Sequence, residues 1–198
     1  STGRVTPLSG DGTVAEFAPA PKGNVVIWHD LATPPDLYLL EAGRTTPRRI
    51  TDSNATLLAA RSLSPFEQFS FKGWNDETVY GYVVKPFGFA ADRKFPIAFV
   101  VHGGPQVSFQ NQWNWRWNAQ AFAARGFAVI AIDFHGSPGY GQAFTDSISE
   151  HWGDRPFEDL QKGLAAALTK YPWMDGKRAC SLGASYGGYM QNWIAGKW

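Results

Sequence analysis

The sequence predicts an α/β fold class with a mostly parallel, doubly wound sheet, and three observations support this prediction. Three short apolar runs have the length and composition of strands that are buried on both faces. Segments with the periodicity or the end signals of helices lie between these runs. The chain ahead of them contains only short strands and turns. Strands that alternate with helices are typical of a parallel sheet with helices on both sides.

Residues 1–64 are expected to form antiparallel strands joined by turns. The predicted strands are Val25–Trp28, Leu37–Leu40 and Arg48–Thr51. The segments between them contain Pro, Gly and Asp, which favour turns. This pattern has the length of about one blade of a β-propeller, so we assign residues 1–64 to the C-terminal portion of a propeller domain. Because one blade cannot bury both of its faces alone, we expect further sequence on the N-terminal side.

The pattern changes at Ser62–Pro65, and residues 65–198 are expected to form the N-terminal portion of a second domain. A hairpin is predicted first, from two strand-like segments around a Gly-Trp-Asn-Asp turn. Buried strands and helices then alternate to the end of the chain. The predicted elements are the hairpin strands Phe66–Lys72 and Thr78–Lys85, strand Ile97–Val101, helix 114–125, strand Phe127–Ile132, helix Phe157–Tyr171, strand Arg178–Leu182 and helix Tyr186–Ala195.

The helix over Phe157–Tyr171 has the clearest signal. Its apolar residues recur at helical spacing on one face, namely Leu160, Leu164, Ala167 and Leu168. Pro156 stands at its start and Pro172 beyond its end, where each is tolerated. The helix over 114–125 is predicted to end at Gly126.

Composition excludes several classes of function. The 198-residue chain has 18 basic and 17 acidic residues and a net charge of +1, so no basic face for nucleic acid is implied. Its longest apolar runs have strand length, well short of a membrane span. The single cysteine, Cys180, excludes an intramolecular disulfide and is expected to pack in the core. The histidines lack metal-binding spacing, so no metal site is expected, and the compartment is not fixed by these features.

The strongest chemical signal is a G-x-S-x-G motif centred on Ser185, between an apolar strand and a helix. In α/β-hydrolases this motif is the turn that exposes the nucleophilic serine. Gly183 and Gly187 are expected where larger side chains would collide, and Gly188 where the helix packs close to the sheet. The Tyr186 amide is expected to point at developing negative charge. A phosphate-binding loop is disfavoured, because no Gly-Lys-Ser/Thr or G-x-G-x-x-G pattern is present.

The second signal is the sequence His102-Gly103-Gly104-Pro105, directly after the strand over Ile97–Val101. In α/β-hydrolases the loop at this place supplies the second amide of the oxyanion hole. Glycines allow the backbone to turn that amide toward a substrate carbonyl. We expect His102 to brace the loop rather than to transfer protons. The alternative is an ordinary turn at the end of a strand.

Four motifs in order resemble the prolyl oligopeptidase family of serine peptidases, in particular its dipeptidyl aminopeptidase and acylaminoacyl-peptidase branch. They are His102-Gly103-Gly104-Pro105, Gly136-Ser137-Pro138-Gly139-Tyr140-Gly141, Trp152-Gly153-Asp154 with Glu158-Asp159-Leu160, and Gly183-Ala184-Ser185-Tyr186-Gly187-Gly188-Tyr189-Met190. The resemblance runs from about residue 66 to residue 198. It implies Ser185 as the nucleophile, the amides of Tyr186 and Gly104 as the oxyanion hole, short peptides as substrates, and no cofactor.

Two features depart from that family pattern. His135 stands where the family usually has Arg, so a contact that braces the loop is expected to be altered. None of residues 186–198 is Asp, Glu or His, although this fold orders its triad Ser, then Asp or Glu, then His. We therefore expect the catalytic Asp and His beyond the end of this chain, in an incomplete hydrolase domain. The alternatives are an esterase or lipase on the same fold, or a catalytically dead fragment with a structural or binding role.

Overall fold

The computed structural model describes residue 3 and residues 5–198, and it divides the chain into two compact units. One unit extends to Leu63 and also includes Asn111–Asn118. The other comprises Ser64–Gln110 and Ala119–Trp198. The boundary in sequence lies inside the segment Ser62–Pro65, where the residue pattern changes, but the return of Asn111–Asn118 to the first unit was not anticipated.

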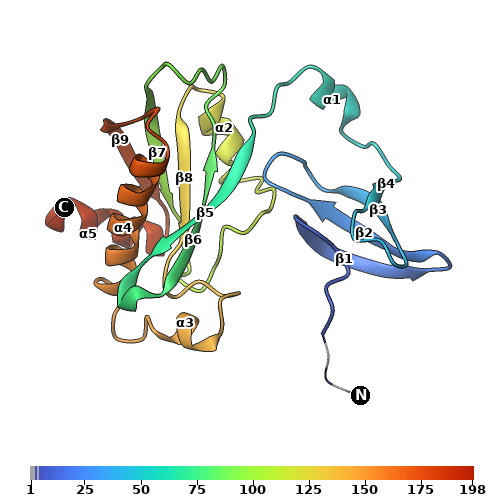
Figure 1. Ribbon diagram of the computed structural model, residues 1–198, viewed down its shortest axis with the longest axis horizontal. Coiled ribbons are helices and arrows are strands. Elements are labelled where there is room, and N and C mark those ends of the chain that lie inside the picture. The colour runs from blue at the N-terminus through green and yellow to red at the C-terminus, as the bar shows by residue number, and fades with distance from the viewer. Residues whose placement is uncertain (1–2, 4) are drawn as a thin grey trace. The chain divides into compact units, whose positions relative to one another are not determined.

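The first unit contains a four-stranded antiparallel sheet with the strand order β1-β2-β3-β4 (Figure 1). The strands are β1 Thr13–Ala20, β2 Gly23–His29, β3 Asp36–Glu41 and β4 Arg48–Arg49. A short helix, α1 (Ala55–Ala59), follows them. The small core of this sheet consists of Val26, Tyr38 and Leu40, with Val14 and Trp28 packed against it.

The three strands predicted in this region are confirmed as β2, β3 and β4, whereas β1 was not predicted. The segment of β1 contains Pro19 and no continuous apolar run. Proline cannot donate to a strand ladder and is confined mainly to edge strands. Within the described part of the chain β1 pairs with β2 alone, which places it at an edge of this sheet. Its pairing is therefore decided by its partner rather than by its own residues.

The helix predicted over 114–125 is wrong at its N-terminal end, since α2 spans only Ala119–Ala123. The residues before it belong to the first unit and bond to other residues of that unit instead. The Trp113 amide donates to Nδ1 of His29 at 2.9 Å, and the Asn111 side chain accepts from the Leu31 amide at 3.2 Å. Oδ1 of Asn114 accepts from the amides of Arg116 and Trp117, which follow it in the chain, at 2.9 and 2.8 Å. Such local side-chain bonds compete with helix formation.

The second unit contains a five-stranded sheet with the order β5-β6-β8-β7-β9. The strands are β5 Phe66–Lys72, β6 Thr78–Val84, β7 Phe95–Val101, β8 Ala128–Asp133 and β9 Met174–Gly183. β8, β7 and β9 are parallel neighbours, whereas β5 pairs with β6 and β6 with β8 in antiparallel fashion. The expected mostly parallel sheet is thus a mixed sheet. The reason is the predicted hairpin, which adds two antiparallel strands to the parallel part.

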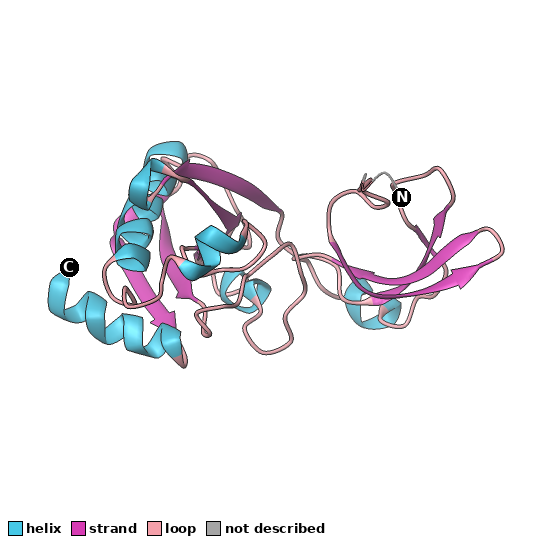
Figure 2. Ribbon diagram, turned by 90° about the horizontal axis from the view of Figure 1, so that it is seen from below, coloured by secondary structure: helices cyan, strands magenta, loops and turns pink. Residues whose placement is uncertain are grey.

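The remaining helical elements of this unit are two short ones and two longer helices. They are η1 Trp74–Asp76, α3 Gln142–Asp146, α4 Arg155–Lys170 and α5 Tyr186–Lys197. The predicted helix over Phe157–Tyr171 is confirmed as α4, which has Pro156 in its first turn and ends before Pro172. Figure 2 shows the helix that leads to the C-terminus, α5, following directly on the last strand.

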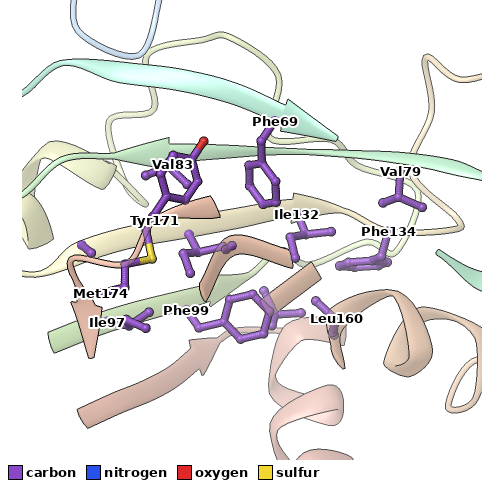
Figure 3. Packing of buried hydrophobic residues seen from close by; sticks show 14 of the residues in the cluster. Phe69, Val79, Val83, Ile97, Phe99, Ile132, Phe134, Leu160, Tyr171 and Met174 are labelled. Atoms are coloured by element: carbon purple, nitrogen blue, oxygen red, sulfur yellow. The ribbon is translucent and has the colours of Figure 1, made fainter. Parts of the chain in front are cut away.

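The core of the second unit lies between α4 and one face of the sheet (Figure 3). Leu160 of α4 packs there with Phe99 of β7 and Ile132 of β8, and all three are at most 1% exposed. Residues of the opposite face of β7 and β8, such as Val100 and Val129, are also buried, and α2 contacts β6 and β8. The prediction that these two strands are buried on both faces is confirmed.

β9 contradicts the prediction of a third strand buried on both faces. Residues 177–181 of β9 are exposed, and the strand pairs with β7 alone in the part of the chain that the structure describes. Cys180 is accordingly exposed and not a core residue as predicted. Apolar composition cannot distinguish a central strand from one at the sheet edge. Among the described residues, no helix is long and apolar enough to cross a membrane.

The close packing of α4 on the sheet yields a test of the core. A Cβ atom on Gly163 of α4 would lie 2.1 Å from Cδ1 of Ile132 and 2.7 Å from the Phe71 ring. Gly163→Ala is therefore expected to lower the free energy of unfolding by about 1–3 kcal/mol, as over-packed core substitutions do. Chemical denaturation measures this change.

Gly196→Ala is the matched control, because a Cβ atom at Gly196 of α5 would meet nothing within 4 Å. It should leave the free energy of unfolding unchanged or raise it by less than about 1 kcal/mol, through the better helix propensity of alanine. Equal destabilisation by both substitutions would contradict the steric explanation.

Candidate active site

Ser185 occupies a strained turn between β9, which ends at Gly183, and α5, which begins at Tyr186. Its backbone angles are φ 58° and ψ −123°, a combination that L-residues rarely adopt. Two backbone hydrogen bonds hold the turn, from the Gly187 amide to the Ala184 carbonyl and from the Tyr189 amide to the Ser185 carbonyl. Strain of this kind costs about 1–3 kcal/mol and is concentrated at functional sites. The strained turn is therefore the feature of the structure on which a functional hypothesis for Ser185 can be based.

The glycines of this turn, which we call the elbow (residues 183–188), allow it to press against the end of β7. β7 and β9 are paired so that Val101 stands opposite Gly183. A Cβ atom on Gly183 would lie 2.6 Å from the Val101 carbonyl oxygen, and one on Gly187 only 2.3 Å from the same oxygen. Neither position can accept a side chain unless the backbone moves. The elbow is thus fitted to the strand that carries the next loop.

Gly188 differs from these two glycines. A Cβ atom there would have only the Gly183 carbonyl oxygen within 4 Å, at 3.9 Å, which is ordinary contact. The prediction that Gly188 is needed for close packing of the helix on the sheet is therefore wrong. Sequence spacing cannot show which of two adjacent glycines faces the neighbouring strand.

The loop His102–Pro105 follows β7 directly and lies against Ser185. A Cβ atom on Gly103 would be 3.3 Å from Cβ of Ser185, 3.9 Å from its Oγ and 3.1 Å from the Ala184 carbonyl oxygen. Gly104 has a φ of +113°, and a Cβ atom on it would come within 2.6 Å of the Gln106 amide nitrogen. Each glycine meets a different constraint, one from the elbow and one from the fold of its own loop. The structure thus brings the two strongest motifs of the sequence together.

His102 is held inside these loops by both ring nitrogens. Nδ1 lies 2.7 Å from the Gly103 carbonyl oxygen, and Nε2 lies 2.9 Å from Oγ of Ser137. The ring stacks on Phe134 at 4.1 Å between centroids. Burial lowers the pKa of His102, against smaller opposing effects of the Gly103 carbonyl and the Asp133 carboxylate. Both nitrogens are occupied by loop atoms, so neither serves Ser185.

Asp133, the last residue of β8, forms hydrogen bonds to the loop that follows His102–Pro105 and to the loop that contains Tyr140. Its carboxylate accepts from the Ser108 hydroxyl at 2.7 Å, the Phe109 amide at 2.6 Å and the Tyr140 hydroxyl at 2.6 Å. Burial, together with this carboxylate, raises the pKa of Tyr140, so its hydroxyl remains a donor. Asp133 was not singled out from the sequence. Its position at the end of a predicted buried strand could have indicated that it lies among the loops of the site.

His135 braces the loop after β8 through a buried carboxylate. Its Nδ1 and its backbone amide both bond to Oδ2 of Asp159 at 2.7 Å, and its ring stacks on Phe144 at 4.0 Å. Oδ1 of the same carboxylate accepts from the Trp74 amide at 2.7 Å. The Nε2 atom of His135 lies 3.5 Å from a carboxylate oxygen of Glu77. One buried carboxylate therefore joins α4, the loop after β8 and the β5–β6 hairpin.

The remaining motif, Trp152-Gly153-Asp154, meets the helix that follows the elbow. The Tyr186 hydroxyl donates to the Trp152 carbonyl at 2.7 Å, and burial raises the pKa of Tyr186, which keeps this donor protonated. A Cβ atom on Gly153 would lie 2.6 Å from the Trp193 ring. All four motifs that are spaced along the sequence thus contact one another or a shared neighbour at one end of the sheet.

None of the four histidines is hydrogen-bonded to Ser185 in the part of the chain that the structure describes. His29 accepts from the Trp113 amide, and His151 lies 2.8 Å from the Asp154 carboxylate. His102 and His135 are bound as given above. No group of three or more His, Cys, Asp or Glu side chains that could hold a metal ion occurs among the described residues.

Comparison with known proteins gives consistent results. The model of the prolyl oligopeptidase family matches residues 113–198. Dipeptidyl-peptidase 5 of Schizosaccharomyces pombe is 44% identical over 136 residues, which are 68% of this chain and 20% of that protein. A probable dipeptidyl-peptidase 5 of Aspergillus clavatus is 36% identical over 164 residues, 81% of this chain and 22% of that protein. The chain thus spans about one fifth of the length of these curated relatives.

A solved structure is similar over nearly the whole chain. The acylaminoacyl peptidase of Pyrococcus horikoshii matches with a TM-score of 0.84 and 26% sequence identity, over 96% of this chain and 30% of that one.

The two adjacent glycines of the elbow provide a matched pair of substitutions. Gly187→Ala would drive a methyl group into the Val101 carbonyl, so it should destabilise the protein by at least about 1–3 kcal/mol and displace Ser185. Gly188→Ala has room and should leave stability within about 1 kcal/mol of the wild type. Thermal unfolding and the rate of fluorophosphonate labelling measure the two effects. Similar losses in both variants would show that the steric assignment is wrong.

Proposed function

This chain belongs to the prolyl oligopeptidase family, and on that premise we propose that the full-length protein is a serine peptidase with Ser185 as its nucleophile. The observation that carries the proposal is the strained turn at Ser185, with Gly103 in contact with it. A serine held in this way, with a loop of backbone amides beside it, suits attack on a carbonyl carbon.

The proposed reaction passes through an acyl-enzyme. The Ser185 hydroxyl attacks a peptide carbonyl while a histidine takes its proton and then gives it to the leaving amine. Water hydrolyses the resulting ester and releases the second product. We propose that the histidine and the aspartate that orients it come from sequence outside this chain. In support, all four histidines here have other partners, and the matched segments cover only about one fifth of the curated relatives.

We propose the amides of Tyr186 and Gly104 as the oxyanion hole. Tyr186 is the first residue of α5, where unpaired amides and the helix dipole favour negative charge. Gly104 directly follows the glycine that contacts Ser185. In this arrangement both amides would lie about 3 Å from the oxygen that becomes negative as the serine attacks.

The substrates that we propose are short peptides. The first unit, with its four-stranded antiparallel sheet, fits the end of the β-propeller that screens substrates by size in this family. The curated relatives are dipeptidyl-peptidases, so release of dipeptides is the activity to assay first. Dipeptide and acylaminoacyl substrates with the same leaving group would separate the two specificities.

Covalent labelling tests the nucleophile directly. A fluorophosphonate probe is expected to modify Ser185 in the full-length protein, and peptide mapping should find the adduct on the elbow peptide. Ser185→Ala should abolish labelling and reduce kcat by several orders of magnitude, because the covalent intermediate cannot form. An adduct on another serine of the active protein would contradict the proposal.

The 198-residue chain expressed alone is expected to show no peptidase turnover. Without a histidine base the Ser185 hydroxyl remains protonated near neutral pH and is a poor nucleophile. The assay compares the chain and its Ser185→Ala variant on short peptide substrates. Turnover at an ordinary enzymatic rate that depends on Ser185 would mean that one of the four histidines of this chain is the base.

A further inference from the structure

The direction of the Gly104 amide is set by the peptide bond that joins it to Gly103. A trans peptide is planar, so its carbonyl and its N–H point in opposite directions within one plane. The Gly103 carbonyl is fixed by Nδ1 of His102 at 2.7 Å. A group that keeps Nδ1 of His102 protonated and in place therefore also sets the direction of the Gly104 N–H.

The donor state of His102 follows from its two partners. A carbonyl oxygen can only accept, so the contact with Gly103 requires the proton on Nδ1. Burial lowers the pKa of the ring, which favours the neutral form with a single proton. Nε2 then carries a lone pair, and the Ser137 hydroxyl, 2.9 Å away, donates to it. The Gly103 carbonyl thus selects the tautomer, and Ser137 supplies the donor that Nε2 then needs and holds the ring in this orientation.

Ser137 is itself firmly placed. It is fully buried, and its amide donates to the Phe134 carbonyl at 2.9 Å. Its carbonyl accepts from the Thr145 hydroxyl at 3.2 Å. Phe134 also stacks on the His102 ring with an interplanar angle of 14°, which prevents the ring from turning away from Ser137. The hydroxyl and the imidazole are therefore pre-aligned.

We propose that Ser137 is a positioning residue that acts through His102 to aim the Gly104 amide at the oxyanion of the reaction. This inference rests on the proposed function and adds to it a residue outside the elbow and its neighbouring loop. With the other tautomer, lone pairs of Nδ1 and of the Gly103 carbonyl would face each other at 2.7 Å. The peptide between two glycines would then rotate, and the Gly104 N–H would turn away.

Ser137→Ala in the full-length protein is the first test. It removes the donor to Nε2, and kcat should fall about 10- to 100-fold, somewhat less than the full loss of an oxyanion-hole donor. KM should stay within about threefold, because the amide acts in the transition state. Ser64→Ala is the matched control: Ser64 is also buried, and its backbone rather than its hydroxyl bonds to Gln120. A Ser137→Ala variant that is folded and keeps its kcat overturns the proposal.

A pair of histidine substitutions decides the question independently. The amide of His102→Asn can present an N–H near the place of Nδ1, whereas that of His102→Gln presents one near the place of Nε2. The Asn variant should retain at least about tenfold more kcat than the Gln variant, since only it can hold the Gly103 carbonyl. If the two variants have equal kcat, or if the Gln variant has the higher kcat, the proposal is overturned. This comparison remains decisive even if Ser137→Ala fails to fold.

Two further measurements separate this inference from the proposed function. Nitrogen-15 NMR of the imidazole should show the neutral Nδ1–H tautomer at His102 in the wild type, and in Ser137→Ala a changed Nε2 shift that reports the loss of its hydrogen-bond donor. An Nε2–H tautomer in the wild type overturns the positioning role even if Ser185 is the nucleophile. If Ser185→Ala retains turnover, the proposed function is contradicted, and the role proposed for Ser137 is contradicted with it.

Discussion

The close approach of the elbow to the carbonyl of Val101 is the constraint on which the site depends. It requires Gly183 and Gly187, because a side chain at either position would occupy the place of that oxygen. The same approach brings the loop that leaves β7 against Ser185, since Val101 is the last residue of β7. Ser185 and its neighbouring loop are thus positioned by one contact between two parallel strands.

Buried hydrogen bonds then fix the loops around this contact. Asp133 and Asp159 each accept three bonds from loops and helices that lie far apart in the sequence. A buried carboxylate is costly unless it is satisfied in this way, so each one favours a single arrangement of its donors. His102 and Ser137 extend the same principle to a neutral pair. These polar networks lie at the strand ends, above the apolar core of the sheet.

Where sequence reasoning failed, the cause was a contact that local patterns do not record. Residues 114–118 have helical spacing, but Trp113 and Asn111 bond to the first unit and Asn114 caps a turn. β9 was expected to be buried on both faces, yet among the described residues it pairs with β7 alone, and Cys180 is exposed there. In both segments, tertiary position overrides a correct local propensity.

The sequence by itself determined the α/β class, most of the strands, the main helix and the serine at the elbow, because periodicity and the glycine spacing around Ser185 are local properties. The tertiary structure decided the mixed pairing of the sheet and which glycines are sterically required: Gly187 faces the Val101 carbonyl, whereas Gly188 has room. It also decided the partners of His102 and His135. Ser137 lies far from His102 in the sequence, and Asp159 lies far from His135. Only the packing of the strand ends brings the polar atoms of each pair within hydrogen-bonding distance.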